Sequence, residues 1–175
     1  MFKKIALGIL VLVVAVLAFA TTKPDSFSVE RKISINAPPE KVFANINDFH
    51  AWDAWSPWAK LDPAMQTTHS GAPSGPGAVY EWSGNSDVGK GRMEITGATP
   101  PSNVTIKLDF LEPFESHNTT VFNLAPTAAG TDVTWTMSGP QPYVSKLMAT
   151  FMSMDKMIGG DFEKGLAQLK TVSEK

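Results

Sequence analysis

The sequence predicts an α+β domain in which an antiparallel sheet packs against one long C-terminal helix, with an apolar helix preceding the domain. Between residues 78 and 139, apolar and polar residues alternate, and short turns rich in Gly, Pro and Asn separate the alternating runs, as in antiparallel hairpins. From Tyr143 to Thr171 the apolar residues recur every three or four positions, as on a helix about 43 Å long. This helix has to bury its apolar face, and the sheet is the only large partner available.

The N-terminal segment, residues 1–22, is predicted to be a membrane anchor or a signal segment. Lys3 and Lys4 precede an uncharged run from Ile5 to Ala20, which as a helix spans roughly 24 Å of a bilayer core roughly 30 Å thick. The lysines keep the N-terminus in the cytoplasm. We therefore expect a single-pass protein of the inner (cytoplasmic) membrane with its domain on the extracytoplasmic side. The alternative is a soluble periplasmic or secreted protein, cleaved near Ala20 after a small-x-small triplet.

A linker at residues 23–26 leads to the domain, which is predicted to occupy residues 27–173. Its first strand covers the alternating stretch FSVERKISINA. Pro38 then begins the first of two short helices. A loop from Ser70 to Ala78 has Gly or Pro at five of its nine positions and precedes the remaining strands.

Composition excludes several classes of function. The chain has 175 residues, a formal charge of −2 and no run of Lys or Arg, so nucleic acid is not an expected partner. With no cysteine it has no disulfide, thiolate metal site or cysteine nucleophile. The three histidines, His50, His69 and His117, lack the spacing of metal ligands. We expect neither a metal nor another cofactor.

The order of these elements resembles the helix-grip fold of the START and birch-pollen-allergen superfamily, also called SRPBCC, with its polyketide cyclase/dehydrase and lipid-transport proteins. Three stretches carry the resemblance: SVERKISINAPPEKVFANINDFHAWDAWSPW, GAVYEWSGNSDVGKGRMEI and MDKMIGGDFEKGLAQLK. The resemblance implies a curved antiparallel sheet wrapped around the C-terminal helix, with an apolar cavity between them. It implies a fold more firmly than a function, since the superfamily includes carriers, cyclases and sensors.

In that fold, the residues of one strand parity face the cavity, because successive side chains point to opposite faces of a sheet. Together with two residues of the long helix, this parity predicts the following ligand-binding residues: Tyr80, Trp82, Met93, Phe110, Asn118, Thr120, Trp135, Phe151 and Gly160. Gly160 and its neighbour Gly159 lie in the middle of the helix, where two glycines cost roughly 2 kcal/mol relative to alanine. They serve either close helix–sheet packing or room for a ligand.

Three tryptophans, Trp52, Trp55 and Trp58, lie within seven residues and are spaced as on one face of a helical turn. The resemblance places them in a lid at one end of the cavity. Direct contact with a ligand and an interfacial membrane contact are the two alternatives.

The predicted function is a membrane-tethered or exported binding protein for a small hydrophobic or amphipathic molecule, lipid-like or polyketide-like. The cavity-facing residues include no acid–base pair, and no nucleophile motif is present. Asp161, at the edge of the helix stripe, is expected on a solvated flank. One rival is a cyclase or hydrolase of the same fold. The other is an envelope protein with a filled cavity and an apolar surface for another protein.

Overall fold

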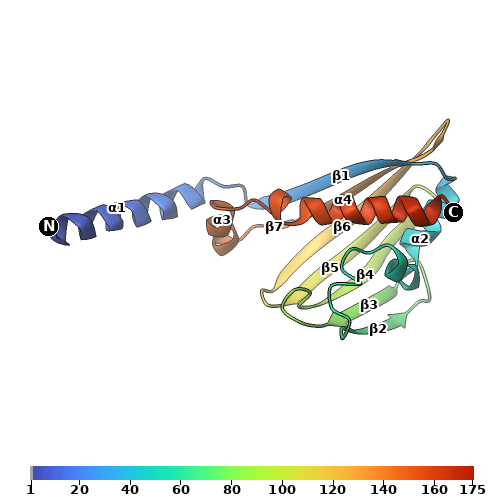
Figure 1. Cartoon of the computed structure of the whole chain (residues 1–175), viewed down its shortest axis with the longest axis horizontal. Coiled ribbons are helices and arrows are strands. Elements are labelled where there is room, and N and C mark those ends of the chain that lie inside the picture. Colours follow the sequence, from blue (N-terminus) through green and yellow to red (C-terminus); the bar gives the residue numbers. More distant parts are fainter. Residues whose placement is uncertain (1) are drawn as a thin grey trace.

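The structure, a computed structural model, describes residues 2–175 and contains one seven-stranded sheet, four α-helices and one 3₁₀-helix. The elements along the chain are α1 (Phe2–Thr21), β1 (Ser26–Ile35), α2 (Pro39–Asn47), η1 (Phe49–Ala54), β2 (Gln66–Gly71), β3 (Ala78–Ser83), β4 (Lys90–Thr99), β5 (Asn103–Glu112), β6 (Ser116–Thr127), β7 (Gly130–Pro140), α3 (Tyr143–Ala149) and α4 (Met154–Ser173). α1 projects away from the body formed by the other elements (Figure 1).

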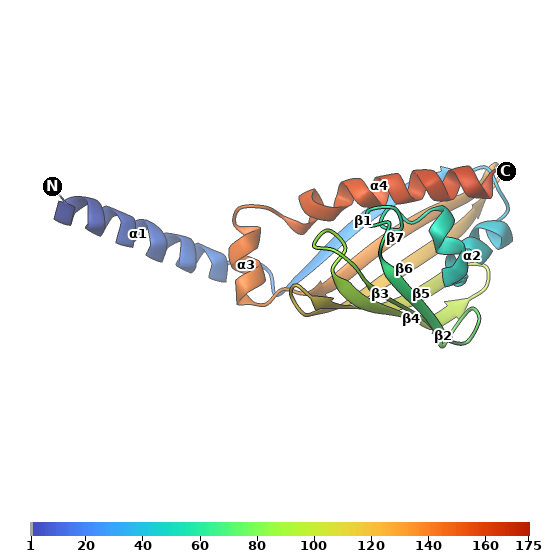
Figure 2. The same ribbon diagram turned by 60° about the horizontal axis from the view of Figure 1, so that its bottom comes forward.

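The sheet has the strand order β1-β7-β6-β5-β4-β3-β2, and all neighbouring strands are antiparallel. β2 to β7 follow one another as a meander, and β1 returns to pair with β7. α4 lies along one face of the curved sheet, and α2 lies near the C-terminal end of α4 (Figure 2). The predicted α+β class and helix-grip arrangement are confirmed.

The two faces of the sheet divide the strand residues as predicted. Ile95 is fully buried on the face that α4 covers, whereas Glu81 is exposed on the other face. Asp109 is an exception, because it belongs to the outer face yet is buried. Lys107 and His117 contact its carboxylate at 2.8 and 2.7 Å. Ion pairing therefore compensates for the loss of water around this charge.

β2 is a strand that the sequence does not predict, and its last two residues belong to the stretch from Ser70 to Ala78 that is predicted as a loop. It is an edge strand that pairs only with β3. Only His69 is partly buried in it, and its other residues are exposed. A strand that is polar on both faces shows no alternation of apolar and polar residues, so its sequence carries no strand signal.

The C-terminal helix is also divided, whereas the sequence predicted one helix from Tyr143 to Thr171. α3 ends at Ala149, and α4 begins after Ser153, whose extended backbone and side chain cap the new helix by accepting from the Lys156 N–H. The apolar stripe continues along α4 but does not include the residues before the break. Phe151 lies in the connecting turn and is 78% exposed.

Arg31 of β1 explains one of the two helix glycines. Its guanidinium lies against α4 and pairs with Asp155 and Glu163, both at 2.7 Å. A Cβ at Gly159 would collide with the guanidinium, whereas a Cβ at Gly160 would have no neighbour within 4 Å. Gly159 therefore permits close helix–sheet packing, as one of the two readings of the pair predicted.

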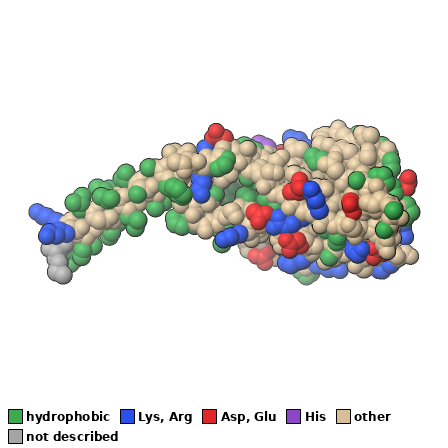
Figure 3. All heavy atoms as spheres, turned by 90° about the horizontal axis from the view of Figure 1, so that it is seen from above, with side chains coloured by type: hydrophobic (Ala, Val, Ile, Leu, Met, Phe, Trp, Pro, Cys, Tyr) green, Lys and Arg blue, Asp and Glu red, His purple; other side chains and the backbone are tan. Residues whose placement is uncertain are grey.

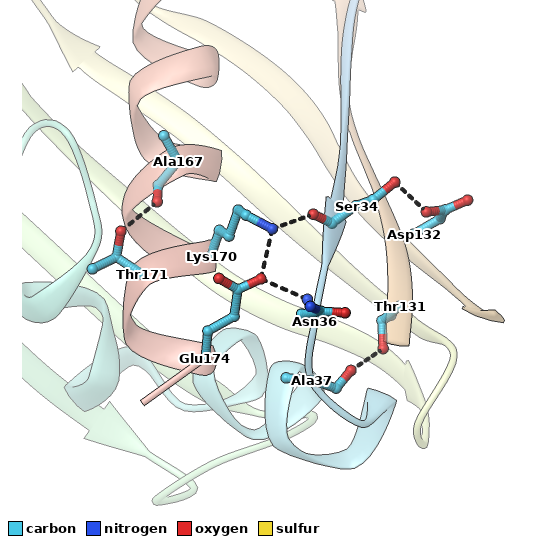
Figure 4. Close-up of polar contacts among 9 residues, drawn as sticks. All are labelled: Ser34, Asn36, Ala37, Thr131, Asp132, Ala167, Lys170, Thr171 and Glu174. Atoms are coloured by element: carbon cyan, nitrogen blue, oxygen red, sulfur yellow. Dashed lines mark hydrogen bonds and ion pairs between the residues drawn. The ribbon is translucent and has the colours of Figure 1, made fainter. Parts of the chain in front are cut away.

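The last turn of α4 is fastened to the end of β1 by polar contacts (Figure 4). Lys170 Nζ donates to the Ser34 carbonyl at 2.8 Å, and the Glu174 carboxylate accepts from Lys170 and from the Asn36 N–H, both at 2.6 Å. These contacts hold the C-terminal half of α4 across the sheet. The same half buries Phe162, Leu166 and Leu169.

Candidate apolar binding cavity

An apolar cavity of about 200 Å³ lies between the sheet, the first half of α4 and the segment after η1. Its deepest lining residues are buried: Trp52, Tyr80, Leu108, Thr120, Trp135, Met137 and Phe162. Its other lining residues are at least partly exposed: Asp53, Ser56, Trp58, Ala59, Met65, Trp82, Val88, Met93, Phe110 and Ile158. The exposed set comes largely from residues 53–65, the β3–β4 turn and the start of α4, so the cavity opens between these segments.

The tryptophans after α2 are held by their indole nitrogens. Trp52 Nε1 donates to the Ile46 carbonyl and Trp55 Nε1 donates to the Asn45 carbonyl, both at 3.0 Å. These carbonyls belong to the last turn of α2, where a helix leaves acceptors free. Trp55 is fully buried and does not line the cavity, whereas Trp52 and the partly buried Trp58 do. The burial of Trp52 and Trp55 is incompatible with a membrane contact by these two side chains.

An aromatic cluster forms the floor of the cavity around Trp135. The Trp135 ring stacks on Phe162 of α4 with ring centroids 4.1 Å apart, and its centroid lies 4.9 Å from that of Phe122. Trp55 and Trp58 meet it edge-on at 5.8 and 6.0 Å. The Trp135 Nε1 group is buried and has no acceptor among the described residues. The floor is therefore rigid, apolar and rich in π surface.

The structure places six of the nine predicted ligand-binding residues at the cavity wall: Tyr80, Trp82, Met93, Phe110, Thr120 and Trp135. The other three do not line it. Asn118 is buried beside Gly139 and donates to Ser116 Oγ at 3.2 Å. Phe151 lies in the exposed turn before α4, and Gly160 is on the solvent side of that helix. Phe151 is outside the wall because the helix, which the sequence predicts to be continuous, breaks before Ser153. Of the two adjacent glycines, it is Gly159 that faces the sheet and Gly160 that faces solvent.

Sequence reasoning also missed part of the wall. Ser56, Ala59 and Met65 belong to the irregular segment between η1 and β2, where neither a period of two nor one of 3.6 indicates which side chains point inward. Val88 belongs to the β3–β4 turn, and its carbonyl accepts from Trp82 Nε1 at 2.9 Å. Asp62 joins these two segments, since its side chain accepts from the Asn85 N–H at 2.8 Å.

Tyr80 and Asp53 are the titratable residues of the lining. Burial raises the pKa of the Tyr80 hydroxyl, and the negative charge of Asp53 raises it further. The phenol therefore stays protonated near neutral pH and is a hydrogen-bond donor. Asp161 is not part of the wall and pairs with Lys164 at 2.9 Å, on the solvated flank expected for it.

The histidines do not form a metal site within residues 2–175, where no group of three or more His, Cys, Asp or Glu side chains has the geometry to hold an ion. Two of them nevertheless meet at the surface. The rings of His50 and His69 stack with centroids 4.2 Å apart, and Asp48 contacts His50 Nδ1 at 2.8 Å. The sequence separation of 19 residues hid this contact.

Comparisons with known proteins agree with the fold. The chain superimposes with a TM-score of 0.60 on a protein from Chromobacterium violaceum, at 17% identity, covering 87% of this chain and 99% of that one. The di-domain ARO/CYC StfQ from the steffimycin biosynthetic pathway gives a TM-score of 0.63 at 10% identity, covering 85% of this chain and 51% of StfQ. The Aha1 dimer from Colwellia psychrerythraea gives 0.54 at 16% identity, covering 85% and 94%.

These identities show a shared fold and no more. None of the curated proteins compared with the chain matches it significantly. The sequence of residues 26–174, which is the whole body of the structure without α1, matches the family described as polyketide cyclase / dehydrase and lipid transport. The cavity between sheet and helix lies entirely within the matched residues. The chain therefore belongs to the polyketide cyclase/dehydrase and lipid-transport family.

Proposed function

We propose that the protein is a membrane-tethered binding protein that holds a small hydrophobic or amphipathic molecule in this cavity. The observation that carries the proposal is the wall itself: a preformed, apolar and aromatic space that contains only a few polar groups. Such a space binds by removing apolar surface from water, which contributes about 25 cal/mol for each Å² buried. The hydroxyls of Tyr80 and Thr120 and the unpaired indole N–H of Trp135 are polar groups in the deep part of the wall.

The size of the cavity narrows the class of ligand. About 200 Å³ is below the range of roughly 300–1,000 Å³ that is typical of sites for drug-sized molecules. A single aromatic ring or a short acyl chain fits this space. A polycyclic polyketide needs either a larger cavity or a position in which part of it remains outside the opening.

The tether is supported by the way α1 joins the domain. α1 is long and apolar enough to cross a membrane, and almost all of it is exposed. With Phe2 and Thr21 included, it reaches roughly 30 Å, the thickness of a bilayer core. Its end is packed against the body: Ala20 is fully buried, and Tyr143 of α3 donates to the Leu17 carbonyl at 3.0 Å. Cleavage near Ala20 would remove these contacts.

A cyclase is the second candidate, and one observation favours it. Asp53 and Tyr80 both line the cavity, and Asp53 is close enough to affect the pKa of Tyr80. A carboxylate and a neutral phenol are a possible general base and general acid for a substrate held between them. Turnover of a bound compound that is lost in both Asp53→Asn and Tyr80→Phe would favour this candidate over binding alone.

The binding proposal is tested by a size series of ligands added to the full chain in detergent micelles. The series contains fatty acids of increasing length, isoprenoids, quinones, single-ring phenols and polycyclic aromatics. A ligand that binds only the folded state stabilises it by RT ln(1 + [L]/Kd), about 2.7 kcal/mol at a hundredfold excess over Kd. We expect the smaller members to raise the melting temperature and to change the tryptophan fluorescence, since Trp58, Trp82 and Trp135 line the site.

A matched pair of variants distinguishes cavity binding from binding elsewhere. Ala59→Phe places a ring at the partly exposed rim of the cavity, whereas Ala64→Phe adds the same ring to an exposed position outside the lining. Ala59→Phe should abolish the ligand-induced shift while circular dichroism stays unchanged, and Ala64→Phe should preserve the shift. The binding proposal is wrong if no compound in the series shifts the wild type, or if both variants respond equally.

A further inference from the structure

α3 is an amphipathic helix whose apolar side chains are exposed. None of its residues is buried, and it packs mainly against α1, where Tyr143 contacts Leu17. Val144 and Met148, one turn apart, are 64% and 49% exposed, and the stripe continues into the turn with Phe151 and Met152 at 78% and 54%. Exposed apolar side chains on consecutive turns indicate a missing partner.

The β5–β6 turn adds a second apolar element at the same end of the body. Phe114 at its tip is 70% exposed, and Leu111 beside it is also exposed. The strand register fixes their position: Ser26 pairs with Pro140, and Lys90 pairs with Glu112. One end of the sheet, where these strands begin or finish, therefore holds the start of β1, the end of β7 before α3, and the β3–β4 and β5–β6 turns. We call Leu111, Phe114, Val144, Met148, Phe151 and Met152 the proximal face.

α1 sets the depth of the proximal face. The Leu17 carbonyl that accepts from Tyr143 lies four residues before the end of α1, hence roughly 6 Å from that end along the helix axis. Lys146 pairs with Asp25 in the linker between α1 and β1, so α3 is fixed both to α1 and to the linker that follows it. Figure 3 shows hydrophobic side chains along α1, lysines at its tip, and charged side chains gathered on the body. If α1 spans the bilayer, Tyr143 lies at the depth of the interface, where tyrosine is enriched.

We propose that the proximal face rests in the interfacial layer of the leaflet at which α1 ends, so that the domain is seated on the membrane as well as tethered to it. This inference rests on the proposed tether. A lipid surface fits better than a protein partner, because the face is continuous with a membrane-spanning helix and Tyr143, which precedes its Val144, is held at interfacial depth. Apolar side chains buried there gain about 25 cal/mol for each Å² removed from water.

The cavity lies near the proximal face, so contact with the membrane would bring its opening close to the lipid. Trp82, Phe110 and Met137 line the cavity within three residues of the ends of β3, β5 and β7, at the same end of the sheet as the proximal face. Val88 of the β3–β4 turn and Ile158 at the start of α4 form part of the rim. The opening, which is bounded by residues 53–65, this turn and the start of α4, thus extends to the end of the body that faces the lipid, and a hydrophobic ligand dissolved in the bilayer has a short path to the cavity.

Because the chain contains no cysteine, a single introduced cysteine can be labelled at a chosen position. Single cysteines are introduced into the full chain at Val144, Phe151 and Phe114, labelled with a nitroxide, and reconstituted in phosphatidylcholine/phosphatidylglycerol vesicles. Val11→Cys in α1 reports insertion of the tether, and Ala128→Cys in the β6–β7 turn, at the opposite end of the sheet, reports a water-exposed position. Collision rates with oxygen, which partitions into lipid, and with a nickel chelate, which stays in water, are measured at each position.

The inference predicts an oxygen-to-nickel ratio at Val144, Phe151 and Phe114 that is well above the ratio at Ala128 and close to that at Val11. High nickel accessibility at the three proximal positions, with Val11 in lipid, would overturn the seating and leave the tether intact. Labels hidden from both reagents would instead show a protein contact, such as a second copy, and would also overturn it. A water-exposed or missing Val11 label would show that the tether itself is wrong.

Discussion

Trp135 joins the sheet, α4 and the tryptophan segment in one cluster, so its side chain should contribute heavily to stability. Trp135→Ala removes a buried ring that stacks on Phe162, and we expect it to lower the free energy of unfolding by about 3–5 kcal/mol. Thr134→Ala, on the outer face of the same strand, should stay within about 0.5 kcal/mol. Chemical denaturation checks both values, and equal effects would contradict the register of β7.

Trp135→Phe separates the ring from its N–H group. The indole nitrogen is buried without an acceptor, so this change removes an unsatisfied donor together with part of the ring. We expect the loss of stability to be less than half that of Trp135→Ala. A loss as large as that of the alanine variant would mean that the N–H group has an acceptor in solution.

The buried carboxylate of Asp109 should make the free energy of unfolding decrease at acid pH. Burial acts to raise the pKa of this carboxyl, but hydrogen bonds from Lys107 and His117 outweigh it and lower the pKa below its ordinary value. Because the folded pKa is the lower one, the contribution is complete above the unfolded pKa of roughly 3.9 and is lost as pH falls through the folded pKa.

Urea unfolding between neutral pH and acid checks this expectation. Asp109→Asn should flatten the loss of stability on the acid side of the profile. Asp87→Asn, an exposed carboxylate outside the ion pairs among residues 2–175, serves as the control and should leave the profile unchanged. An unchanged profile in Asp109→Asn would contradict the assigned role.

Residue-level prediction worked where a side chain's direction follows from strand periodicity. Tyr80, Trp82, Met93 and Trp135 were correctly placed on the inner face because successive strand residues point to opposite sides. It failed at Phe151, because an apolar residue at helical spacing looks the same before and after a break in the helix. A cap such as Ser153 is a weak signal in a sequence, since serine is common in other settings.

In helix α4, the two adjacent glycines allow a comparison of the same substitution on the inner and the outer face. Gly160→Ala adds a methyl group in open space, so it should stabilise the helix by about 0.5–1 kcal/mol. Gly159→Ala has the same effect on propensity, but its methyl group collides with the Arg31 guanidinium and displaces it from Asp155 and Glu163. We therefore expect Gly159→Ala to be less stable than Gly160→Ala.

A double-mutant cycle attributes the difference to Arg31. In an Arg31→Ala background the guanidinium is gone, so Gly159→Ala and Gly160→Ala should be equally stabilising. The measurement is urea denaturation of all six proteins. A difference that persists without Arg31 would show that Gly159 is required for another reason.

The elements themselves were predictable to different degrees. β3 to β7 were recognised because each carries several alternations and is bounded by turn residues. β2 was not, because it lies at the sheet edge with almost no buried side chain. In η1 and the segment after it, the side chains that point into the cavity follow no period. The wall of the cavity was therefore predictable on the sheet side and not on the opposite side.

For the whole molecule, orientation in the membrane is the first property to measure. Lys3 and Lys4 precede α1, so the C-terminus should be extracytoplasmic. A C-terminal reporter that is active only outside the cytoplasm should be active, and the full-length chain should fractionate with membranes. Lys3→Glu combined with Lys4→Glu should weaken this bias. A reporter active only in the cytoplasm would contradict the orientation, and a soluble chain starting near Thr21 would contradict the anchor.

The architecture as a whole could be predicted because order of elements, strand parity and a long terminal helix leave few alternatives. How α1 meets the body could not, since the contact between Leu17 and Tyr143 joins residues 126 positions apart. The same holds for the volume of the cavity, which depends on how a few large rings stack. The contact between α1 and the body and the volume of the cavity both depend on side-chain packing, which leaves no periodic pattern in a single sequence.

Because β1 and β2 are both edge strands, the sheet is an open frame and not a closed ring. Within the described chain, the backbone hydrogen bonds of residues 56–65 stay inside the segment except at Ser56, whose N–H donates to the Trp52 carbonyl of η1 at 2.7 Å. The side chain of Asp62 links the segment to the β3–β4 turn. An outward shift of this wall would therefore break the Asp62 contact and the packing of Trp58 on Trp135, but no strand hydrogen bond. The size of the largest ligand that the cavity accepts therefore depends on how far residues 56–65 move outward, and not on the sheet.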